Sequence, residues 1–333
     1  KKINFNKNFL MNKSIAIIAG EPNSISSEII FKSWKLRNQF IHKPFFVIGS
    51  IKLLNLQKKK LKYKIKLKKI DDRFKINDLK GGELPVYDIE YIQKKPFEKI
   101  SNKSNKYIFK CFDVAIKFVK DKKILAFINC PVSKEHLFKN KYQGITEFLS
   151  RKTGQKDNEV MLIYNKELSV CPVTTHIPLS QVNKNISQYK IVKKVKIIND
   201  FYKKIFGKKP NFAILGLNPH NFSSSKKSEE KKIISRAIKT LIKLKIKVTG
   251  PVAPDSSFMI FKKYKFNVVI GMYHDQVLTP FKTLYNFKAI NITLGLPYIR
   301  VSPDHGVAEN IIGRKISNPE SLIESIKFFN YIN

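Results

Sequence analysis

Cysteine is scarce in this chain, with only Cys111, Cys130 and Cys171 among 333 residues. An odd number of cysteines in apolar surroundings argues against a disulfide framework and favours the reducing cytoplasm. Because the chain also lacks a run of about 18 apolar residues, we expect no transmembrane helix and no membrane partner. Residues 1–13 lack the apolar stretch and cleavage site of a signal peptide, so we interpret them as a disordered lead-in.

Acidic residues are few, with 25 Asp and Glu against 64 Lys and Arg, and the formal net charge is +39. Such a charge could attract nucleic acid or an anionic membrane. Lysine is nevertheless spread along the whole chain beside isoleucine and asparagine, as A/T-rich codon usage would produce. Residues 58–69 alternate lysine with apolar residues, which predicts an exposed edge strand rather than a base-reading surface. We therefore expect no specific nucleic-acid partner, although the positive field could help recruit a phosphorylated substrate.

A dinucleotide-binding glycine fingerprint is absent as well. Residues 20–28 follow the first predicted strand and open a helix, but they do not have the G-x-G-x-x-G spacing. The turn could still present backbone N–H groups to an anion, as helix N-termini do.

Strand and helix patterns alternate along the chain, which predicts an α/β fold with a largely parallel sheet. The length allows two domains or lobes. We expect strands at 15–19, 44–49, 124–129, 212–217, 268–272 and 289–293, and helices at 27–38, 111–120, 187–206, 229–244 and 319–331.

Three of the six histidines lie in similar settings. His176, His220 and His274 each follow an apolar run that is typical of a buried strand, and each lies in a polar, turn-like segment. Ligands of open α/β sheets bind at such strand ends. Three neutral imidazoles with open coordination positions suit a catalytic divalent metal. Their wide spacing matches no local zinc pattern, so three ordinary polar histidines remain the alternative.

Other polar residues at predicted strand ends are candidates for a site. Lys134 is either a solvated lysine or a cation near an anionic substrate, and Thr146 is a plausible N-cap. Asp255 is either another N-cap or a carboxylate near the metal. Lys282 and Arg300 could clamp a phosphate or carboxylate, and Arg300 stands out because arginine is scarce in this lysine-rich chain.

Several segments, in the same order along the chain, make the sequence resemble the 4-hydroxythreonine-4-phosphate dehydrogenase family. They are Pro131–Lys134, Gly144–Phe148, Thr174–Leu179, Gly216–His220, Tyr273–Gln276, Asn291–Arg300 and Asp304–Gly306. The resemblance extends from about residue 14 to residue 331.

The resemblance implies a two-lobed fold like that of isocitrate and isopropylmalate dehydrogenases, with largely parallel sheets flanked by helices and an active-site cleft between the lobes. We expect residues 14–137 and 295–333 to form the first lobe and residues 138–294 the second, which would carry a dimer interface. It further implies a homodimer with its active site near the subunit interface.

The resemblance also assigns roles to individual residues. His176, His220 and His274 would be the metal ligands. The substrate-contacting positions would be Thr146, Lys282, Asn291 and Arg300. Residues 306–319 would hold the adenosine part of NAD, with Gly306, Ala308 and Asn318 as cofactor-binding positions. Asp255 or Asp275 would assist the base, and Lys134 would transfer a proton or bind phosphate.

The sequence fixes neither the identity of the metal nor the choice between NAD and NADP. Three histidines suit zinc or cobalt, while magnesium and manganese are possible where substrate oxygens complete the shell. Either NAD or NADP could be used, and Arg314 or Lys315 would be the partner of a 2′-phosphate.

The implied reaction is oxidation of 4-phosphooxy-L-threonine at C3 by NAD or NADP, then decarboxylation to 3-amino-2-oxopropyl phosphate, in pyridoxal 5′-phosphate biosynthesis. Alternatives are a relative acting on threonate or erythronate 4-phosphate, a non-catalytic paralogue, and a basic nucleic-acid-binding protein. The sequence departs from the family at Ile145, where the family has histidine, and in 20–28 and 221–227, where the family has more glycine.

Overall fold

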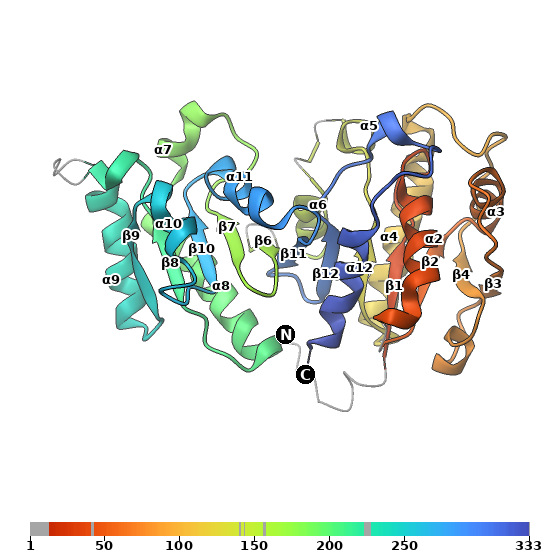
Figure 1. Cartoon of the computed structure of the whole chain (residues 1–333), viewed down its shortest axis with the longest axis horizontal. Helices are drawn as coiled ribbons and strands as arrows, with labels where there is room; N and C mark the ends of the chain where they lie inside the picture. The colour runs from red at the N-terminus through yellow and green to blue at the C-terminus, as the bar shows by residue number, and fades with distance from the viewer. Residues whose placement is uncertain are drawn as a thin grey trace. The chain divides into compact units, whose positions relative to one another are not determined.

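The computed structural model describes residues 13–40, 43–139, 141–142, 144–155, 158–222 and 228–332. All of the expected N-terminal lead-in except Lys13 lies outside these residues. The chain divides into two compact units, residues 1–156 with 296–333 and residues 157–295 (Figure 1).

The boundary between the units differs from the one expected from sequence, 137/138. Helices α5 (Lys134–Phe138) and α6 (Ile145–Lys152) belong to the first unit. The reason is packing, because Ile145, Phe148 and Leu149 are buried in the same apolar cluster as Phe112 and Phe127 of that unit.

The sheet of the first unit contains β1 (Ser14–Ile18), β2 (Phe45–Gly49), β3 (Leu67–Ile70), β4 (Leu84–Asp88), β5 (Ile124–Asn129) and β12 (Ile299–Pro303). Their order is β3-β4-β2-β1-β5-β12, and each of these neighbouring pairs is parallel. Every residue of β1, β2, β5 and β12 is buried. Continuous burial is expected of parallel strands, since helices cover both faces of such a sheet.

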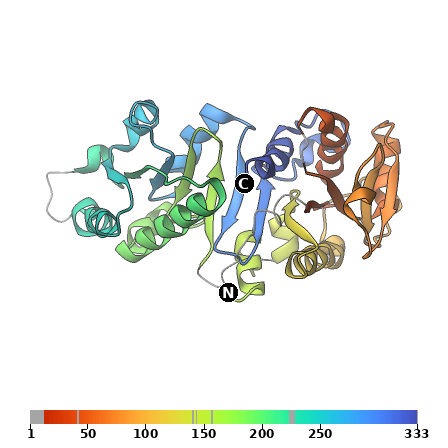
Figure 2. The same cartoon turned by 90° about the horizontal axis from the view of Figure 1, so that it is seen from below.

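Helices lie on both faces of this sheet. Helix α4 (Asn105–Lys120) packs on β1, β2 and β5, whereas α12 (Glu320–Lys327) packs on β12 and on α2 (Ser26–Leu36). Figure 2 shows α4 on one face and α2 with α12 on the other. The short helices of this unit are Arg37–Gln39, Ile76–Leu79, Asn102–Ser104, Glu309–Ile311 and Phe328–Asn330.

The edge strand expected at residues 58–69 is largely wrong. Helix α3 (Ile51–Lys60) extends into this block, and Ser50 caps it by accepting a hydrogen bond from the Leu53 backbone N–H. Only β3 is a strand, and it does lie at the edge of the sheet. The N-cap and the buried Leu53, Leu54 and Gln57 stabilise a helix, because helix formation depends on capping and on one buried face.

The sheet of the second unit contains β6 (Val160–Tyr164), β7 (Ser169–Pro172), β8 (Phe212–Leu215), β9 (Val248–Val252), β10 (Val268–Gly271) and β11 (Ile290–Leu294). Their order is β11-β6-β7-β10-β8-β9. β6 runs antiparallel to β7 and to β11. The tight turn Asn165–Leu168 joins β6 directly to β7, which makes these two strands antiparallel. The other described pairs are parallel.

The helices of the second unit are α7 (Val182–Asn185), α8 (Gln188–Phe206), α9 (Ser235–Lys243), α10 (Pro254–Ile260) and α11 (His274–Tyr285). The described residues of this unit also contain the short 3₁₀ helix Leu179–Gln181, the turn Pro219–Phe222 and the π-helix Glu230–Ile234. The predicted α/β class, with mostly parallel strands flanked by helices, is confirmed. Within the described residues, no helix is both long and apolar enough to cross a membrane.

Removing the Phe112 ring tests the core of the first unit. Phe112 is fully buried in α4, and its ring packs edge-on against Phe127 and Phe148. We expect Phe112→Ala to lower the free energy of unfolding by about 3–5 kcal/mol, because the substitution leaves a cavity. Guanidinium titration followed by circular dichroism measures this loss. Phe287→Ala, which removes a ring that is 45% exposed, is the matched control, and an equal loss in both variants would contradict this account of the core.

Candidate functional site

The three histidines follow three neighbouring strands of the second unit. β10 lies between β7 and β8 and is parallel to both, so the carboxyl ends of the three strands meet at one edge of the sheet. His176 follows β7, His220 follows β8, and His274 follows β10 as the first residue of α11. The ring centroids of His176 and His274 are 5.8 Å apart. Two imidazoles at this separation suit a shared ion, since each nitrogen binds at about 2 Å from the metal.

A carboxylate contacts His274. Its Nδ1 lies 2.7 Å from Asp275 Oδ1. Metal-binding histidines commonly engage a carboxylate through one ring nitrogen, which fixes the tautomer and leaves the other nitrogen for the metal. Asp275 therefore orients His274, so that Nε2 is the nitrogen that could bind an ion.

His220 lies in a turn of unusual backbone conformation. Both His220 and Asn221 are in the left-handed region, with φ of 49° and 62°. The His220 side chain is 86% exposed, and its Nδ1 is 3.6 Å from Asp255 Oδ2. Asp255 lies in the first turn of α10, whose N-cap is Ala253. The structure thus contradicts the N-cap reading of Asp255 and places its carboxylate beside a predicted metal ligand.

The donor chemistry at this edge suits a divalent ion, since imidazoles and carboxylates are metal ligands. Within the part of the chain that the structure describes, no three histidine, cysteine or acidic side chains are close enough to hold an ion. Two of the predicted ligands, His176 and His274, therefore lie together, and His220 stands apart from them beside Asp255.

Side chains tie the three strand ends together. The Gln276 side-chain amide accepts a hydrogen bond from the Met272 backbone N–H at 2.6 Å and donates one to the Gly216 carbonyl at 2.8 Å. Thr174 Oγ1 donates to the Met272 carbonyl at 2.8 Å. Gly216 lies close to the Asn221 side chain, which would have to move to admit a Cβ at this position. The segments that carry His176, His220 and His274 are thus joined to one another.

A buried carboxylate that the sequence analysis missed holds the start of the His220 turn. Glu230 is 2% exposed and accepts hydrogen bonds from the backbone N–H groups of Leu217 and Asn218 and from the Asn218 side-chain amide. Burial alone would raise the pKa of Glu230, but these hydrogen bonds outweigh it and lower the pKa. Paired acids at 229–230, in a chain poor in acids, were the available signal.

Lys282 and Asn291, two predicted substrate contacts, also belong to the second unit. Lys282 lies in the last turn of α11 and is exposed. Asn291 lies on β11, and its buried side-chain oxygen has no hydrogen-bond partner among the described residues. Such an atom needs an explanation, because buried polar atoms are almost always paired. A bound ligand at Asn291 would supply the partner.

Cationic side chains gather in the first unit. Arg300 lies on β12 and is 3% exposed, and its Nε donates to Asn129 Oδ1 at 2.7 Å. Burial lowers the pKa of Arg300 to about 9. Burial, then the charge of Arg300, lowers the pKa of Lys134, while Asp304 opposes this shift. A Cβ on Gly144 would lie 3.9 Å from Lys134 Nζ, so the ammonium group lies beside the start of α6.

The structure of α6 bears on two features of the sequence, the predicted N-cap Thr146 and Ile145, which stands where the family has histidine. Its N-cap is Gly144, so Thr146 is not the N-cap but the second residue of the helix. Ile145 is 6% exposed and packs in the apolar core of the first unit. The residue that stands where the family has histidine therefore serves packing.

The segment expected to hold NAD packs on the first loop of the same unit. The Ile25 backbone N–H donates to the Val307 carbonyl, and the Ser317 N–H donates to buried Glu28. Ala308 adopts a left-handed conformation with φ of 50°, and Gly306 is exposed. The Asn318 side-chain oxygen accepts from the backbone N–H of Glu320 at the start of α12. The cofactor roles of Gly306, Ala308 and Asn318 stay predictions.

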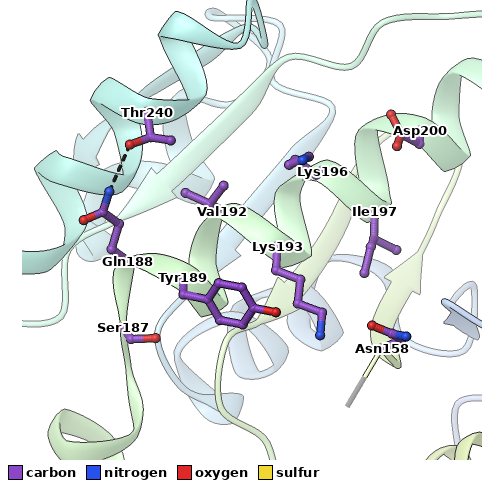
Figure 3. Close-up of a pocket in the computed structure, with 10 residues that line it drawn as sticks. All are labelled: Asn158, Ser187, Gln188, Tyr189, Val192, Lys193, Lys196, Ile197, Asp200 and Thr240. Atoms are coloured by element: carbon purple, nitrogen blue, oxygen red, sulfur yellow. Dashed lines mark hydrogen bonds between the residues drawn. The ribbon is translucent and has the colours of Figure 1, made fainter. Parts of the chain in front are cut away.

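The described surface also has a groove of about 840 Å³ along α8. Figure 3 shows its lining, in which the Gln188 amide donates to Thr240 Oγ1 and Tyr189 lies beside Lys193. None of the predicted site residues lines it. The groove is therefore separate from the predicted site residues.

Three comparisons with known proteins identify the family. The sequence profile of the family "Pyridoxal phosphate biosynthetic protein PdxA" matches residues 41–329. The chain belongs to the PdxA family. A relative from Sulfurihydrogenibium sp., named 4-hydroxythreonine-4-phosphate dehydrogenase, is 39% identical over 94% of this chain and 96% of its own length.

Further PdxA relatives agree in sequence and fold. The crystal structure of 4-hydroxythreonine-4-phosphate dehydrogenase from Klebsiella pneumoniae has a TM-score of 0.81 at 28% identity, over 96% of this chain and 98% of that one. A protein from Oceanobacillus iheyensis, provisionally named D-threonate 4-phosphate dehydrogenase, is 32% identical over 94% of this chain and 95% of its own length. The family thus includes relatives named for two different substrates.

The buried carboxyl of Glu21 provides a test by pH. Glu21 is 2% exposed and accepts hydrogen bonds from the Asn23 N–H and Ser104 Oγ, and burial raises its pKa above the usual 4.5. A raised pKa means that the folded state holds the proton more tightly than the unfolded state. The contribution of Glu21 to the free energy of unfolding therefore falls as the pH rises from 4.5 through the folded-state pKa. We expect Glu21→Gln to gain stability relative to the wild type over that window and to keep the gain at pH 7. Urea titrations at several pH values measure the difference, and a stability difference that does not change with pH would contradict this expectation.

Proposed function

We propose that this PdxA-family chain is a 4-hydroxythreonine-4-phosphate dehydrogenase. It oxidises 4-phosphooxy-L-threonine at C3 with NAD or NADP, and decarboxylation gives 3-amino-2-oxopropyl phosphate for pyridoxal 5′-phosphate biosynthesis. The observation that carries the proposal is the 39% identity, over nearly the whole of both chains, to a relative with that name. The position of the three histidines at neighbouring strand ends supports it.

His176, His220 and His274 would hold the divalent ion, which is zinc, cobalt, magnesium or manganese. When bound there, such an ion polarises a substrate hydroxyl and lowers its pKa. Asp275 holds the His274 ring in position by its contact with Nδ1. Asp255 is a candidate for the base, because its carboxylate is exposed and lies 3.6 Å from His220 Nδ1.

The anionic ends of the substrate need cations and hydrogen-bond donors. In the first unit, Arg300 would supply a buried positive charge and Lys134 an ammonium group whose pKa is lowered, and Thr146 lies in the first turn of α6. A partly desolvated cation binds an anion more strongly than an exposed one, because less water screens the interaction. In the second unit, Lys282 and Asn291 would supply the corresponding contacts.

The nicotinamide cofactor accepts the hydride, and the protein's part is to hold and orient it. Gly306, Ala308 and Asn318 would contact its adenosine part. Hydrogen bonds at Val307 and Ser317 and the left-handed conformation of Ala308 fix the backbone of the segment that would contact the cofactor. Arg314 or Lys315 would meet the 2′-phosphate if the cofactor is NADP.

We further propose that the protein is a homodimer with its active site near the subunit interface. We also propose that it is located in the cytoplasm. Met259 of α10 is 83% exposed and Leu179, shortly after His176, is 69% exposed. Apolar side chains exposed this far beside predicted site residues suit an interface with a second copy. Cys111, Cys130 and Cys171 are free and buried, which suits a reducing compartment.

The alternative substrate is threonate or erythronate 4-phosphate. It is favoured by the relative provisionally named D-threonate 4-phosphate dehydrogenase and by Ile145, which is buried in the core. Activity with these acid phosphates, measured beside 4-phosphooxy-L-threonine, decides between the substrates.

NADH formation with 4-phosphooxy-L-threonine tests the proposed reaction. We expect turnover that is lost on treatment with a chelator and restored by adding a divalent ion, because the ion activates the hydroxyl. His274→Ala should abolish turnover even with added metal. An absence of turnover by folded, metal-supplemented wild-type enzyme with either nicotinamide cofactor would overturn the assigned substrate.

Replacing the buried guanidinium tests the anion contact. We expect Arg300→Lys to raise the KM for the phosphorylated substrate by about tenfold or more, because a planar donor pair is lost. The KM for the nicotinamide cofactor should change little. Steady-state kinetics with each substrate varied in turn measure both constants. Exposed Arg236→Lys is the matched control, and an unchanged substrate KM in Arg300→Lys would rule out this contact.

A further inference from the structure

Tyr298, the residue before β12, has a buried hydroxyl that no described residue pairs. Its side chain is 4% exposed, and its Oη has no hydrogen-bond partner among the described residues. Buried tyrosine hydroxyls usually find a partner, because an unpaired one loses its hydrogen bonds to water when the chain folds. A bound ligand with an acceptor oxygen at this position would remove that cost.

The ring of Tyr298 lies on the same face of the sheet as Arg300. Phe127 of β5 is the strand partner of Arg300, and the ring centroids of Phe127 and Tyr298 are 5.3 Å apart. Paired residues of neighbouring strands project to the same face of a sheet, and so do residues two apart along one strand. Asn129, two residues after Phe127, accepts the hydrogen bond from Arg300 Nε. The phenol and the guanidinium therefore share one face of the first unit's sheet.

The surroundings of Tyr298 combine a neutral donor with positive charge. Burial raises the pKa of Tyr298, and the charge of Arg300 opposes this shift, so the hydroxyl is protonated at neutral pH and can donate. The charge of Arg300 also acts on Lys134, where Asp304 opposes it. Ile145 lies in the same apolar cluster as Tyr298 and has no side-chain donor. Tyr298 is therefore the hydroxyl donor of this apolar cluster that lies near the two cations.

We propose that the Tyr298 hydroxyl donates a hydrogen bond to the phosphate group of the substrate, beside the guanidinium of Arg300. The inference rests on the proposed function, in which Arg300 meets an anionic end of a phosphorylated substrate. It assigns the phosphate to that end and adds a further contact. A phosphate group has three strong acceptor oxygens, so it can accept from a hydroxyl as well as from cationic donors.

Removing one oxygen atom tests the contact, because Tyr298→Phe keeps the ring against Phe127. Calorimetric titration of the full-length protein with inorganic phosphate measures anion binding without requiring turnover or a metal. We expect the dissociation constant of phosphate to rise about tenfold or more, since a hydrogen bond to a charged group is lost. The KM for 4-phosphooxy-L-threonine should rise by a similar factor, and the KM for the nicotinamide cofactor should change little.

Thermal melting separates a ligand contact from a packing role. Because no described residue pairs the hydroxyl, its removal should leave the melting temperature of the ligand-free protein unchanged or raise it. Added phosphate should stabilise the wild type more than Tyr298→Phe, because ligand binding to the folded state stabilises it. Tyr63→Phe is the matched control, since Tyr63 of the same unit is 8% exposed and its hydroxyl likewise has no partner among the described residues. This control should bind phosphate as the wild type does.

The outcomes distinguish the new contact from the proposed function. Weaker phosphate binding by Tyr298→Phe, with normal binding by Tyr63→Phe, supports the contact. Wild-type phosphate affinity in Tyr298→Phe overturns it. A lower melting temperature of ligand-free Tyr298→Phe than of Tyr63→Phe also overturns it, because the hydroxyl is then paired within the protein. If the wild type binds no phosphate, or Arg300→Lys binds it normally, the proposed anion contact of Arg300 fails and this inference fails with it.

Discussion

The candidate metal site depends on one constraint, the parallel alignment of β7, β10 and β8. Parallel strands end at the same edge of a sheet, so three residues far apart in the sequence come to one side of the second unit. Gln276 and Thr174 add hydrogen bonds between the strand ends. The strand order places the histidine segments side by side, and these short polar contacts set how they leave the sheet.

Buried carboxylates have a second organising role in this strongly basic protein. The buried acids in the described residues, Glu21, Glu28 and Glu230, each bind a loop rather than a core side chain alone. Glu21 holds Asn23 and Ser104, Glu28 holds Lys32 and the Ser317 N–H, and Glu230 holds Leu217 and Asn218. Loops that carry functional residues have few apolar contacts, so charge-assisted hydrogen bonds fix them instead.

Arg300 and Lys134 are two cations of the first unit whose surroundings lower their pKa. Lysine is so common in this chain that Lys134 carries little signal by itself. Partial desolvation and then the charge of Arg300 lower the pKa of Lys134, and its ammonium group lies beside the start of α6. The high net charge of +39 is therefore mostly a property of the surface, whereas these two cations belong to a candidate site.

The sequence by itself determined the α/β class, about half of the strands and helices, and the histidines at strand ends, because periodicity and local turns are encoded in neighbouring residues. It did not determine that residues 58–60 end a helix, that α6 belongs to the first unit, or that Ile145 is a core residue. Nor did it reveal Glu230, which accepts hydrogen bonds from residues 12 and 13 positions away, or the contact of Gln276 with Gly216, 60 positions away. Only the tertiary structure decided these, since contacts between distant segments arise from packing and strand order rather than from local pattern.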